Sequence, residues 1–479
     1  MMLTMHSQLI NKLFNYKKIF NILKKTRLIR FIMVEYAQQK RGSCLKYDIR
    51  SFKCIKGEMV LKAQESVKNY ASSVRMYTNY TVREIKKICK NIGPRLAGSE
   101  QEYEAHKYIA EEMKTCCDKV DIEEFKLAPE AFMSWVRIDG VLVLLSILFA
   151  WINNFVDVGF NFAWISVAFT AVALILLFCE FLMYWEFYDF LFPKAMSHNT
   201  IGVRKASGEA KQRIIFSGHV DSSHEWTYTR LGGSPLLFAV GGYGIVSMLY
   251  VLVSSILIGT NALSPDVIEI LRYIQLACIP GAIAVMFFVN FNITVEGAND
   301  NLTGTMASVA IMKYLEDNNI RFENTEVVAM AAGSEESGLR GSRAYVKRHM
   351  DELKEIPTTF IGLETFRDYD SMAIYARDMT GTVKMDSRVC SLVKKAGEHA
   401  GVDLPYSSVY VGASDGAAVQ KLGIPAVTLA SMDPGPPRYY HTRGDTADNM
   451  DMKTVEKCLD IALNTLFIYD EQGLKDHYE

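Results

Sequence analysis

The sequence predicts an α/β domain in which helices sandwich a mostly parallel sheet, with transmembrane helices inserted as two hairpins. Apolar strand-like runs alternate with helical stretches, which is typical of a parallel sheet covered on both faces. Two pairs of long apolar runs interrupt this alternation. Histidine and carboxylate side chains follow several strand-like runs, which indicates a ligand site at one edge of the sheet.

The composition excludes several classes of protein. Hydrophobic residues make up 49% of the chain and charged residues 22%, and the formal net charge is -2. A nucleic-acid-binding domain is usually basic, so we expect no nucleic-acid partner. The nine cysteines are odd in number and form no CxxC pair, which argues against a disulfide framework or a zinc finger and suits a reducing compartment. Histidines and carboxylates must therefore hold any metal.

Residues 1–75 form a first segment that is strongly basic. Six Lys and Arg residues lie among apolar ones between Lys17 and Arg30. This pattern fits an amphipathic helix on an anionic membrane surface. It fits equally well a leader, or a start codon upstream of a true start at Met33 or Met59. A cleaved secretory signal is not expected, because no clean apolar run with a cleavage site follows the charges.

Two hairpins are predicted to cross a membrane. The first, residues 132–193, holds apolar runs at 138–156 and 162–185, and the second, residues 234–294, holds runs at 235–259 and 273–291. Each run is close to the roughly 20 residues that a bilayer core requires. We therefore expect a multi-pass integral membrane protein whose partners include the lipid bilayer.

The charges around the hairpins predict their orientation. The turns at 153–161 and 260–269 contain no Lys or Arg, whereas Lys126, Arg137, Lys194 and Arg204 lie at the other ends. Cytoplasmic loops carry an excess of such residues, so the catalytic side is expected in the cytoplasm. Arg272, near the far end of the fourth run, is an exception.

The remaining segments, 76–131, 194–233 and 295–479, are expected to form one domain. Ser99 begins a helix through a capping box with Glu102, and a strand follows over 120–125. Further strands are expected at 213–216, 325–332, 357–363 and 424–430, with a helix at 303–317. Ligand sites in open α/β sheets lie beyond the carboxyl ends of the strands, so the side chains there should converge. They are His219 and Asp221, Glu335 and Glu336, Glu364, then Tyr440 and His441, with Asp300 in a Gly-Ala-x-Asp-Asn loop beside them.

These motifs carry a resemblance when they are taken together. Gly-Pro-Arg-Leu-Ala-Gly-Ser at 93–99, His-x-Asp, Gly-Ala-x-Asp-Asn, Glu-Glu and Tyr-His-Thr resemble the co-catalytic di-zinc aminopeptidases, metallopeptidase family twenty-eight of clan MH. Relatives of that family include glutaminyl cyclases and glutamate carboxypeptidases. The resemblance covers about residues 80–131, 194–230 and 295–470, and it implies a zinc exopeptidase fold of the phosphorylase/hydrolase-like type. The hairpins look like insertions.

The resemblance implies two Zn2+ ions per chain. Asp300 resembles the carboxylate that bridges them. His219 and Glu364 would complete the coordination of one ion, and Glu336 and His441 that of the other. Zinc accepts imidazole and carboxylate ligands, and a catalytic site leaves a position open for water.

The resemblance also implies catalytic roles for three residues. Glu335 would be the general base, Asp221 would orient His219, and Tyr440 would donate a hydrogen bond to the developing oxyanion. Two departures from the family pattern stand out. Glu364 replaces the usual Asp, with Asp368 as the alternative ligand, and Gly416 after Asp415 either enlarges the substrate pocket or is a simple loop glycine.

The expected function is that of a membrane-anchored metallo-aminopeptidase acting on peptides with a free N-terminus. Two zinc ions would activate a water molecule and a glutamate would handle the protons. A single-zinc enzyme like the glutaminyl cyclases is one alternative. A membrane scaffold that kept the fold and lost the chemistry is another.

Overall fold

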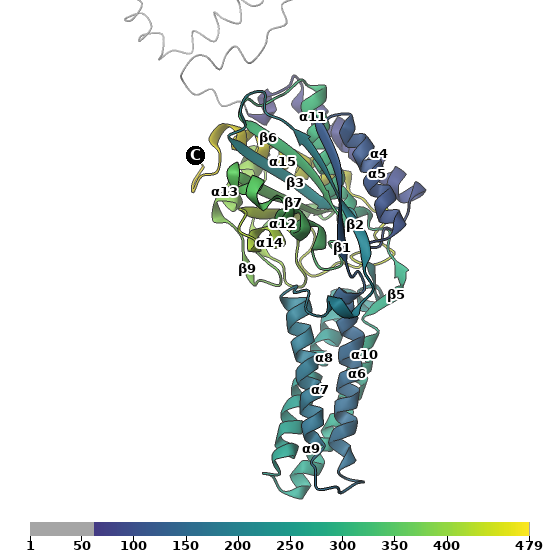
Figure 1. The fold of residues 1–479 in the computed structure, drawn as a ribbon. Coiled ribbons are helices and arrows are strands. Elements are labelled where there is room, and N and C mark those ends of the chain that lie inside the picture. The colour runs from purple at the N-terminus through teal and green to yellow at the C-terminus, as the bar shows by residue number, and fades with distance from the viewer. Residues whose placement is uncertain (1–61, 479) are drawn as a thin grey trace, which may run out of the picture. The chain divides into compact units, whose positions relative to one another are not determined.

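The computed structural model describes residues 62–478. Residues 1–61 of the predicted basic segment, 1–75, lie outside the described residues. The predicted end of this segment is wrong, because the first long helix of the α/β domain, Tyr70–Asn91, begins within it. The described residues belong to one structural unit, in which an α/β domain is joined to a bundle of apolar helices (Figure 1).

A nine-stranded mixed sheet forms the centre of the α/β domain. Its order is β1-β2-β6-β3-β7-β11-β8-β10, with β9 paired to β8. The central strands β6, β3, β7 and β11 are parallel to one another, whereas β1, β2, β8 and β9 add antiparallel pairs toward the edges. The edge strand β10 pairs with β8 in parallel. The α/β fold is thus confirmed, with antiparallel pairs on both sides of the parallel centre. The strands are β1 Lys119–Leu127, β2 Ala195–Arg204, β3 Gln212–His219, β6 Thr325–Ala332, β7 Thr358–Phe366, β8 Met372–Asp378, β9 Val383–Lys384, β10 Tyr406–Ser408 and β11 Ala426–Ser431.

Helices cover both faces of this sheet (Figure 1). On one face, α5, α11, α13 and α15 contact the strands and α4 packs on α11 and α15, while α12 and α14 cover the other face. Helix α11 has its predicted bounds, and the Ser99 side chain caps α5 by accepting from Glu102 N. These helices are α4 Tyr70–Asn91, α5 Glu100–Lys114, α11 Thr303–Asp317, α12 Arg340–Glu355, α13 Ser387–His399, α14 Asp415–Lys421 and α15 Met452–Gln472.

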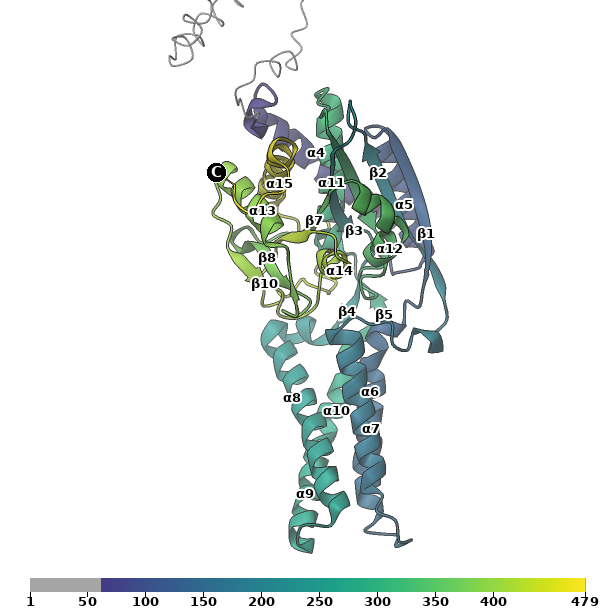
Figure 2. The same ribbon diagram turned by 60° about the vertical axis from the view of Figure 1, so that its left-hand side comes forward.

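The bundle consists of the inserted helices, which run side by side (Figure 2). By length and composition, four helical segments are suited to crossing a membrane: Ala131–Ile152, Ala163–Leu182, Thr227–Thr260 and Pro265–Met286. The first is α6 and the third is α8. The second joins α7 Ala163–Leu176 to the π-helical turn η3 Leu177–Leu182, and the fourth joins α9 Pro265–Ala277 to α10 Ile279–Met286.

Three of the predicted runs had wrong bounds. Helix α6 spans Ala131–Ile152 instead of 138–156. The fourth helical segment begins at Pro265 instead of residue 273, within the turn predicted at 260–269. Helix α8 begins at Thr227 instead of residue 235, and Gly233 interrupts it with a φ of 67° just before Pro235. The fourth run was expected to reach residue 291, but the helix ends at Met286. Residues Val289–Thr294 form strand β5, which pairs with β4 His224–Trp226. Apolar and asparagine side chains alternate along β5, and this period of two favours a strand.

Polar side chains inside the bundle pair with one another. Ser166 Oγ on α7 lies 2.7 Å from Ser255 Oγ on α8, and Thr170 donates to Ser146 Oγ on α6 at 2.8 Å. Gln275 on α9 donates to Ser255 Oγ at 3.1 Å. A buried polar group is unfavourable without a partner, so these contacts define how the helices face one another.

The carboxyl edge of the sheet meets the end of the bundle. Strand β3 ends at His219, β4 follows almost at once, and α8 begins at the next residue, Thr227. The small β4–β5 sheet lies between the main sheet and the helices (Figure 2). The connection therefore places the predicted site next to the bundle.

Candidate metal centre

The structure brings the five predicted metal ligands together around Asp300. Asp300 Oδ1 lies 3.2 Å from His219 Nε2, and Asp300 Oδ2 lies 3.0 Å from His441 Nε2. Glu364 Oε1 is 3.9 Å from His219 Nε2, and Glu336 Oε1 is 3.0 Å from His441 Nε2. Two groups of three potential ligand atoms therefore share one carboxylate.

Each ligand comes from the carboxyl side of the sheet or from the loops beside it. His219 ends β3, Glu336 lies in the turn between β6 and α12, and Glu364 lies within β7, two residues before its end. Asp300 lies in the turn Ala298–Leu302 ahead of α11, and the peptide bond that follows it is cis. His441 comes from the long loop between β11 and α15.

The backbone is strained close to these ligands. Ser334 has a φ of 54°, Thr365 a φ of 43° and His441 a φ of 50°. Residues other than glycine seldom adopt this region, and they do so mainly where the surrounding structure enforces it for function. The strain therefore coincides with the loops that carry Glu335, Glu364 and His441.

Two glycines allow the strands to approach α11 closely. A Cβ atom on Gly218 would lie 2.3 Å from Thr305 N, and one on Gly304 would lie 2.0 Å from Leu363 O. No larger side chain fits at these contacts without moving the backbone. The glycines thus bring His219 and Glu364 to the start of the helix that follows Asp300.

The cluster contains more carboxylates than histidines, so negative charge is in excess. Burial, together with neighbouring carboxylates, raises the pKa of Glu335, Glu336 and Glu364. Burial opposes a charged His441, but Glu336 and Asp300 outweigh it and raise the pKa of His441 to about 10. Such crowding of carboxylates favours a cationic partner at the centre.

The donor set fits zinc. Ligand atoms around a tetrahedral zinc with bonds near 2.0 Å lie roughly 3.3 Å apart, close to the distances measured around Asp300. Imidazole and carboxylate are zinc ligands. Asp300 Oδ2 and Glu336 Oε1 are buried and both face the single His441 Nε2 at 3.0 Å, without a well-aligned hydrogen bond, and a metal ion would satisfy both.

Glu335, the predicted base, lies at the edge of this cluster. Its Oε2 is 3.9 Å from His219 Nε2, and it belongs to neither of the groups that share Asp300. His219, Glu335 and Glu336 do form a third set of potential ligand atoms. The position is compatible with proton transfer, and its role as base remains a prediction.

Asp221 lies beside the site, but its contacts differ from those predicted. Its carboxylate accepts from the backbone N of Glu335 and of Glu336, each at 3.0 Å. His219 Nδ1 is nearer to the Asp221 carbonyl oxygen, at 3.1 Å, than to the carboxylate, at 3.5 Å. Asp221 therefore fixes His219 through its main chain and the two glutamates through its side chain.

Asp368, the alternative ligand, is engaged elsewhere. Its Oδ2 accepts from the Tyr439 hydroxyl at 2.9 Å and from Asp433 N at 3.0 Å. It belongs to none of the potential ligand groups, whereas Glu364 does. The geometry therefore favours Glu364.

Tyr440 packs against the cluster through its ring. The ring stacks on His441 with centroids 3.8 Å apart, and Trp226 meets His441 edge-on at 4.5 Å. Burial and the charge of Asp300 raise the pKa of Tyr440 well above its usual value. Its hydroxyl thus keeps a proton to donate, although the oxyanion role is a prediction that no contact tests.

Sequence reasoning missed several residues that support the ligands. Asp445 accepts from Asn299 N at 2.8 Å and from Asp300 N at 3.1 Å. Arg95 donates to the carbonyls of Val220 and Gly297 and so ties the two ligand loops together. Arg95 lay in a recognised motif, but no local pattern marked Asp445.

Two buried acids complete these surroundings. Glu102 Oε1 accepts from Ser334 N at 2.8 Å and thereby holds the Glu-Glu turn. Asp415 is buried close enough for its charge to raise the pKa of Glu335 and Glu364. In the sequence, Glu102 was recognised only as part of a capping box that begins a helix. Asp415 was noted only as a loop residue before Gly416.

One comparison with protein families agrees with the resemblance. Residues 284–466 match the model described as Peptidase family M28. A search of curated proteins finds no match.

Among solved structures, the chain is similar to BSAP, a zinc aminopeptidase from Bacillus subtilis, at 14% identity over 84% of this chain and 96% of that chain, with a TM-score of 0.48. For an aminopeptidase from Aneurinibacillus sp. strain AM-1, the identity is 15%, the coverages are 85% and 95%, and the TM-score is 0.47. For a glutaminyl cyclase from Bacteroides thetaiotaomicron bound to N-acetylhistamine, the identity is 15%, the coverages are 83% of this chain and 97% of that chain, and the TM-score is 0.46.

The family match includes Asp300, the Glu335–Glu336 pair, Glu364 and His441. It leaves out His219, which the fold brings to the same centre. Residues 284–466 of this chain are therefore similar in sequence to peptidase family M28.

Proposed function

We propose that this chain is a membrane-anchored, zinc-dependent aminopeptidase that removes N-terminal residues from peptides with a free amino terminus. The observation that carries the proposal is Asp300, whose two oxygens face two separate histidines. With Glu364 on one side and Glu336 on the other, the ligands suffice for two zinc ions. The four apolar helices support the membrane anchor.

The proposed reaction is hydrolysis of the first peptide bond. When bound, the two ions would supply Lewis-acid chemistry that acidifies a water molecule and polarises the scissile carbonyl. The Glu335 carboxylate accepts a proton from the attacking water and delivers it to the nitrogen of the leaving amine. The water oxygen bonds to the carbonyl carbon as the C–N bond breaks, which releases one amino acid and a shortened peptide.

Neighbouring residues hold this machinery in place. Asp221 fixes the backbone of Glu335 and Glu336, so the base and a ligand keep a constant separation. Tyr440, with its proton retained, would donate to the oxyanion that forms at the carbonyl.

The decisive experiment uses the full chain in detergent with aminoacyl chromogenic substrates. We expect turnover that a chelator abolishes and that N-acetylation of the substrate prevents. Glu335→Gln should lower kcat by about 10²–10⁴-fold and leave the metal content unchanged. Glu323→Gln, at an exposed position, is the matched control.

Other outcomes would contradict the proposal. Full turnover by Glu335→Gln would remove Glu335 from the role of base. One tightly held zinc with cyclisation of N-terminal glutamine would identify a glutaminyl cyclase. Absence of any metal-dependent turnover would leave a membrane scaffold.

A further inference from the structure

Segments that flank the hairpins form part of the surroundings of the metal centre. Trp226, directly before α8, donates its backbone N–H to His441 O at 2.7 Å and packs its ring against the His441 imidazole. The Trp226 ring also contacts Phe288, at the end of the second hairpin, with centroids 5.2 Å apart. One residue thus joins a candidate ligand to the end of the bundle.

The first hairpin also reaches the site. Tyr184, two residues after η3, is 5% exposed and packs on Phe132 of α6 with ring centroids 4.8 Å apart. The Phe132 ring in turn lies against Gly338, in the turn that carries Glu335 and Glu336, since a Cβ atom on Gly338 would lie 3.0 Å from Phe132 Cδ2. The chain here is fixed to the α/β domain, because Arg343 donates to Tyr184 O at 2.6 Å.

A small cavity lies between Glu336 of the site and residues at the end of the bundle. Its volume is about 20 Å³, which is room for a water molecule or a methyl-sized group. Glu336 lines it on the side of the metal centre, and Met133 of α6, Trp226, Val289 and Phe291 line it with apolar surface on the side of the bundle. The cavity suits a small apolar side chain held beside the proposed reaction centre.

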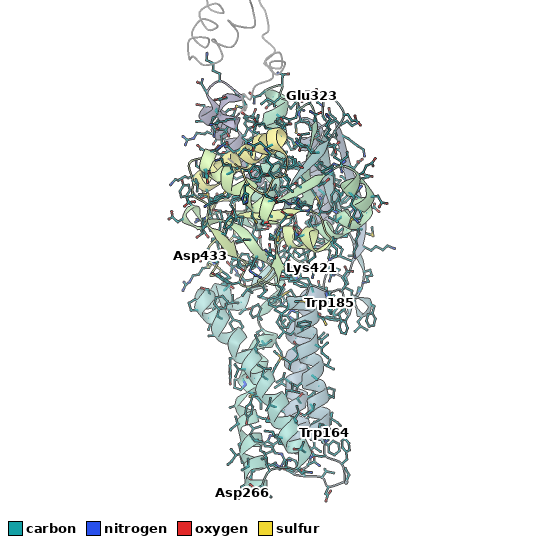
Figure 3. The ribbon with its side chains drawn as sticks, turned by 90° about the vertical axis from the view of Figure 1, so that its left-hand side faces the viewer. Trp164, Trp185, Asp266, Glu323, Lys421 and Asp433 are labelled. Carbon is teal, nitrogen blue, oxygen red and sulfur yellow. The ribbon has the colours of Figure 1, made fainter. Side chains whose placement is uncertain are left out.

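The rim around this junction is apolar and exposed. Trp185, Phe187, Phe190 and Leu191 are 49%, 50%, 77% and 68% exposed. Figure 3 shows Trp185 where the bundle meets the α/β domain. Aromatic side chains gather at membrane–water interfaces, so a bundle that spans the bilayer would bring this rim, and the site beside it, to the lipid surface.

We propose that the substrates are peptides whose N-terminus lies at the membrane surface, with a small apolar residue at the cleaved bond and an apolar segment held in the bilayer. This inference rests on the proposed aminopeptidase function and specifies its substrate class. The cavity receives the small side chain, and the apolar rim receives the chain as it leaves the bilayer.

The test compares three peptides in nanodiscs that contain the full chain. All begin with Ala-Ala-Leu: one continues directly into an apolar anchor of about 20 residues, the second has a hydrophilic spacer of about 30 residues before the same anchor, and the third is soluble. The spacer peptide controls for concentration at the membrane, since only the distance from the bilayer to its N-terminus differs. We expect at least tenfold higher kcat/KM for the directly anchored peptide than for the other two.

The outcomes separate this proposal from the aminopeptidase function. If alanyl-chromogenic substrate is cleaved but the three peptides are cleaved equally, or the spacer peptide matches the directly anchored one, the membrane-peptide proposal is overturned. If neither the peptides nor the chromogenic substrate is cleaved, the aminopeptidase function itself fails.

Variants of Met133 test the cavity. Met133→Trp should fill it and lower kcat/KM for the directly anchored peptide at least tenfold, whereas Met76→Trp, at a position 53% exposed on α4, should not. Met133→Ala enlarges the cavity and should shift the preference from alanine toward leucine at the N-terminus. Wild-type rates in Met133→Trp, or an unchanged preference in a folded Met133→Ala, would contradict the role of the cavity.

Discussion

At the scale of single residues, the centre depends on buried acids that touch no proposed ion. Asp445 is fully buried and accepts hydrogen bonds from Asn299 N, Asn299 Nδ2 and Asp300 N. Burial, together with the charge of Asp300, raises its pKa to about 7. Asp445 therefore positions the loop whose carboxylate faces both histidines.

Replacing this acid should weaken metal binding. Asp445→Asn keeps the shape but turns an amide NH2 toward a backbone N–H, which misplaces Asp300. We expect a loss of about 10–100-fold in zinc affinity, the usual effect of removing a group that orients a ligand. Competition with a chromogenic chelator measures it. Asp448→Asn, whose side chain is 97% exposed, should bind like the wild type, and equal affinity in both variants would refute the positioning role.

A buried histidine predicts a pH dependence of stability. His106 Nδ1 lies 2.9 Å from Thr200 Oγ1, and burial, with smaller effects of His198 and Arg95, lowers the pKa of His106 to about 3. Since this pKa is below the unfolded value of 6.5, the unfolded chain binds more protons between these values. The stabilisation is complete above pH 6.5 and is lost as the pH falls toward 3.

The size of the effect can be measured by thermal unfolding in detergent. Between pH 7.5 and pH 5, His106 should contribute roughly 2 kcal/mol to the loss of stability. His106→Leu should lose less stability over this range than the wild type. His477→Leu, at an exposed position, should keep the wild-type dependence. If the stability of His106→Leu changed with pH as much as that of the wild type, groups other than His106 would dominate the pH dependence.

At the scale of elements, ion pairs connect α12 to the segment that follows the second helix of the first hairpin. Arg340 Nη2 lies 3.1 Å from Asp189 Oδ1, and Arg340 Nη1 lies 3.3 Å from Glu186 Oε1. The Arg340 side chain is 4% exposed and that of Asp189 is 8%. Because α12 follows directly on the Glu-Glu turn, this contact joins the hairpin to a ligand loop.

Breaking the pair should destabilise the protein. Arg340→Met keeps the apolar stem but leaves Asp189 buried without its partner, which typically costs about 3–5 kcal/mol. We expect a lower Tm and faster proteolysis near residues 183–192. Arg348→Met removes a partly exposed pair with Glu123 and should cost less than about 1 kcal/mol. Similar effects in the two variants would contradict a structural role for the buried pair.

At the scale of the whole molecule, the ends of the two inserted hairpins join the α/β domain to an apolar bundle. The ligand loops lie at the carboxyl edge of the sheet, and β4 leads from that edge into α8 within a few residues. Asp266 and Glu323 mark opposite ends of this arrangement (Figure 3). The absence of Lys and Arg from the turns predicted at 153–161 and 260–269 predicts that the Asp266 end lies on the side of the membrane away from the cytoplasm.

Cysteine labelling in intact cells tests this topology. Asp266→Cys should react with a membrane-impermeant maleimide, and Glu323→Cys should react only after the cells are permeabilised. The chain should also stay in the membrane after extraction with alkaline carbonate. Labelling of Glu323→Cys alone in intact cells would reverse the orientation, and release by carbonate would argue against spanning helices.

The sequence by itself determined the α/β class, several of its strands and helices, and the residues of the centre. Apolar runs and capping signals are local, so β6, α11 and the start of α5 were predictable. The convergence of His219, Glu336 and His441 followed from the rule that ligand sites lie beyond the carboxyl ends of parallel strands.

Only the tertiary structure decided how these parts fit together. Asp445 and Asp221 act through backbone N–H groups far away in the sequence, and no local pattern encodes such contacts. Strand β5 was hidden within an apolar run, because hydropathy alone does not separate a short buried strand from a helix. The position of Glu364 rather than Asp368 in the cluster, and the closeness of the centre to the bundle, likewise depend on packing between distant segments, which only the folded chain brings together.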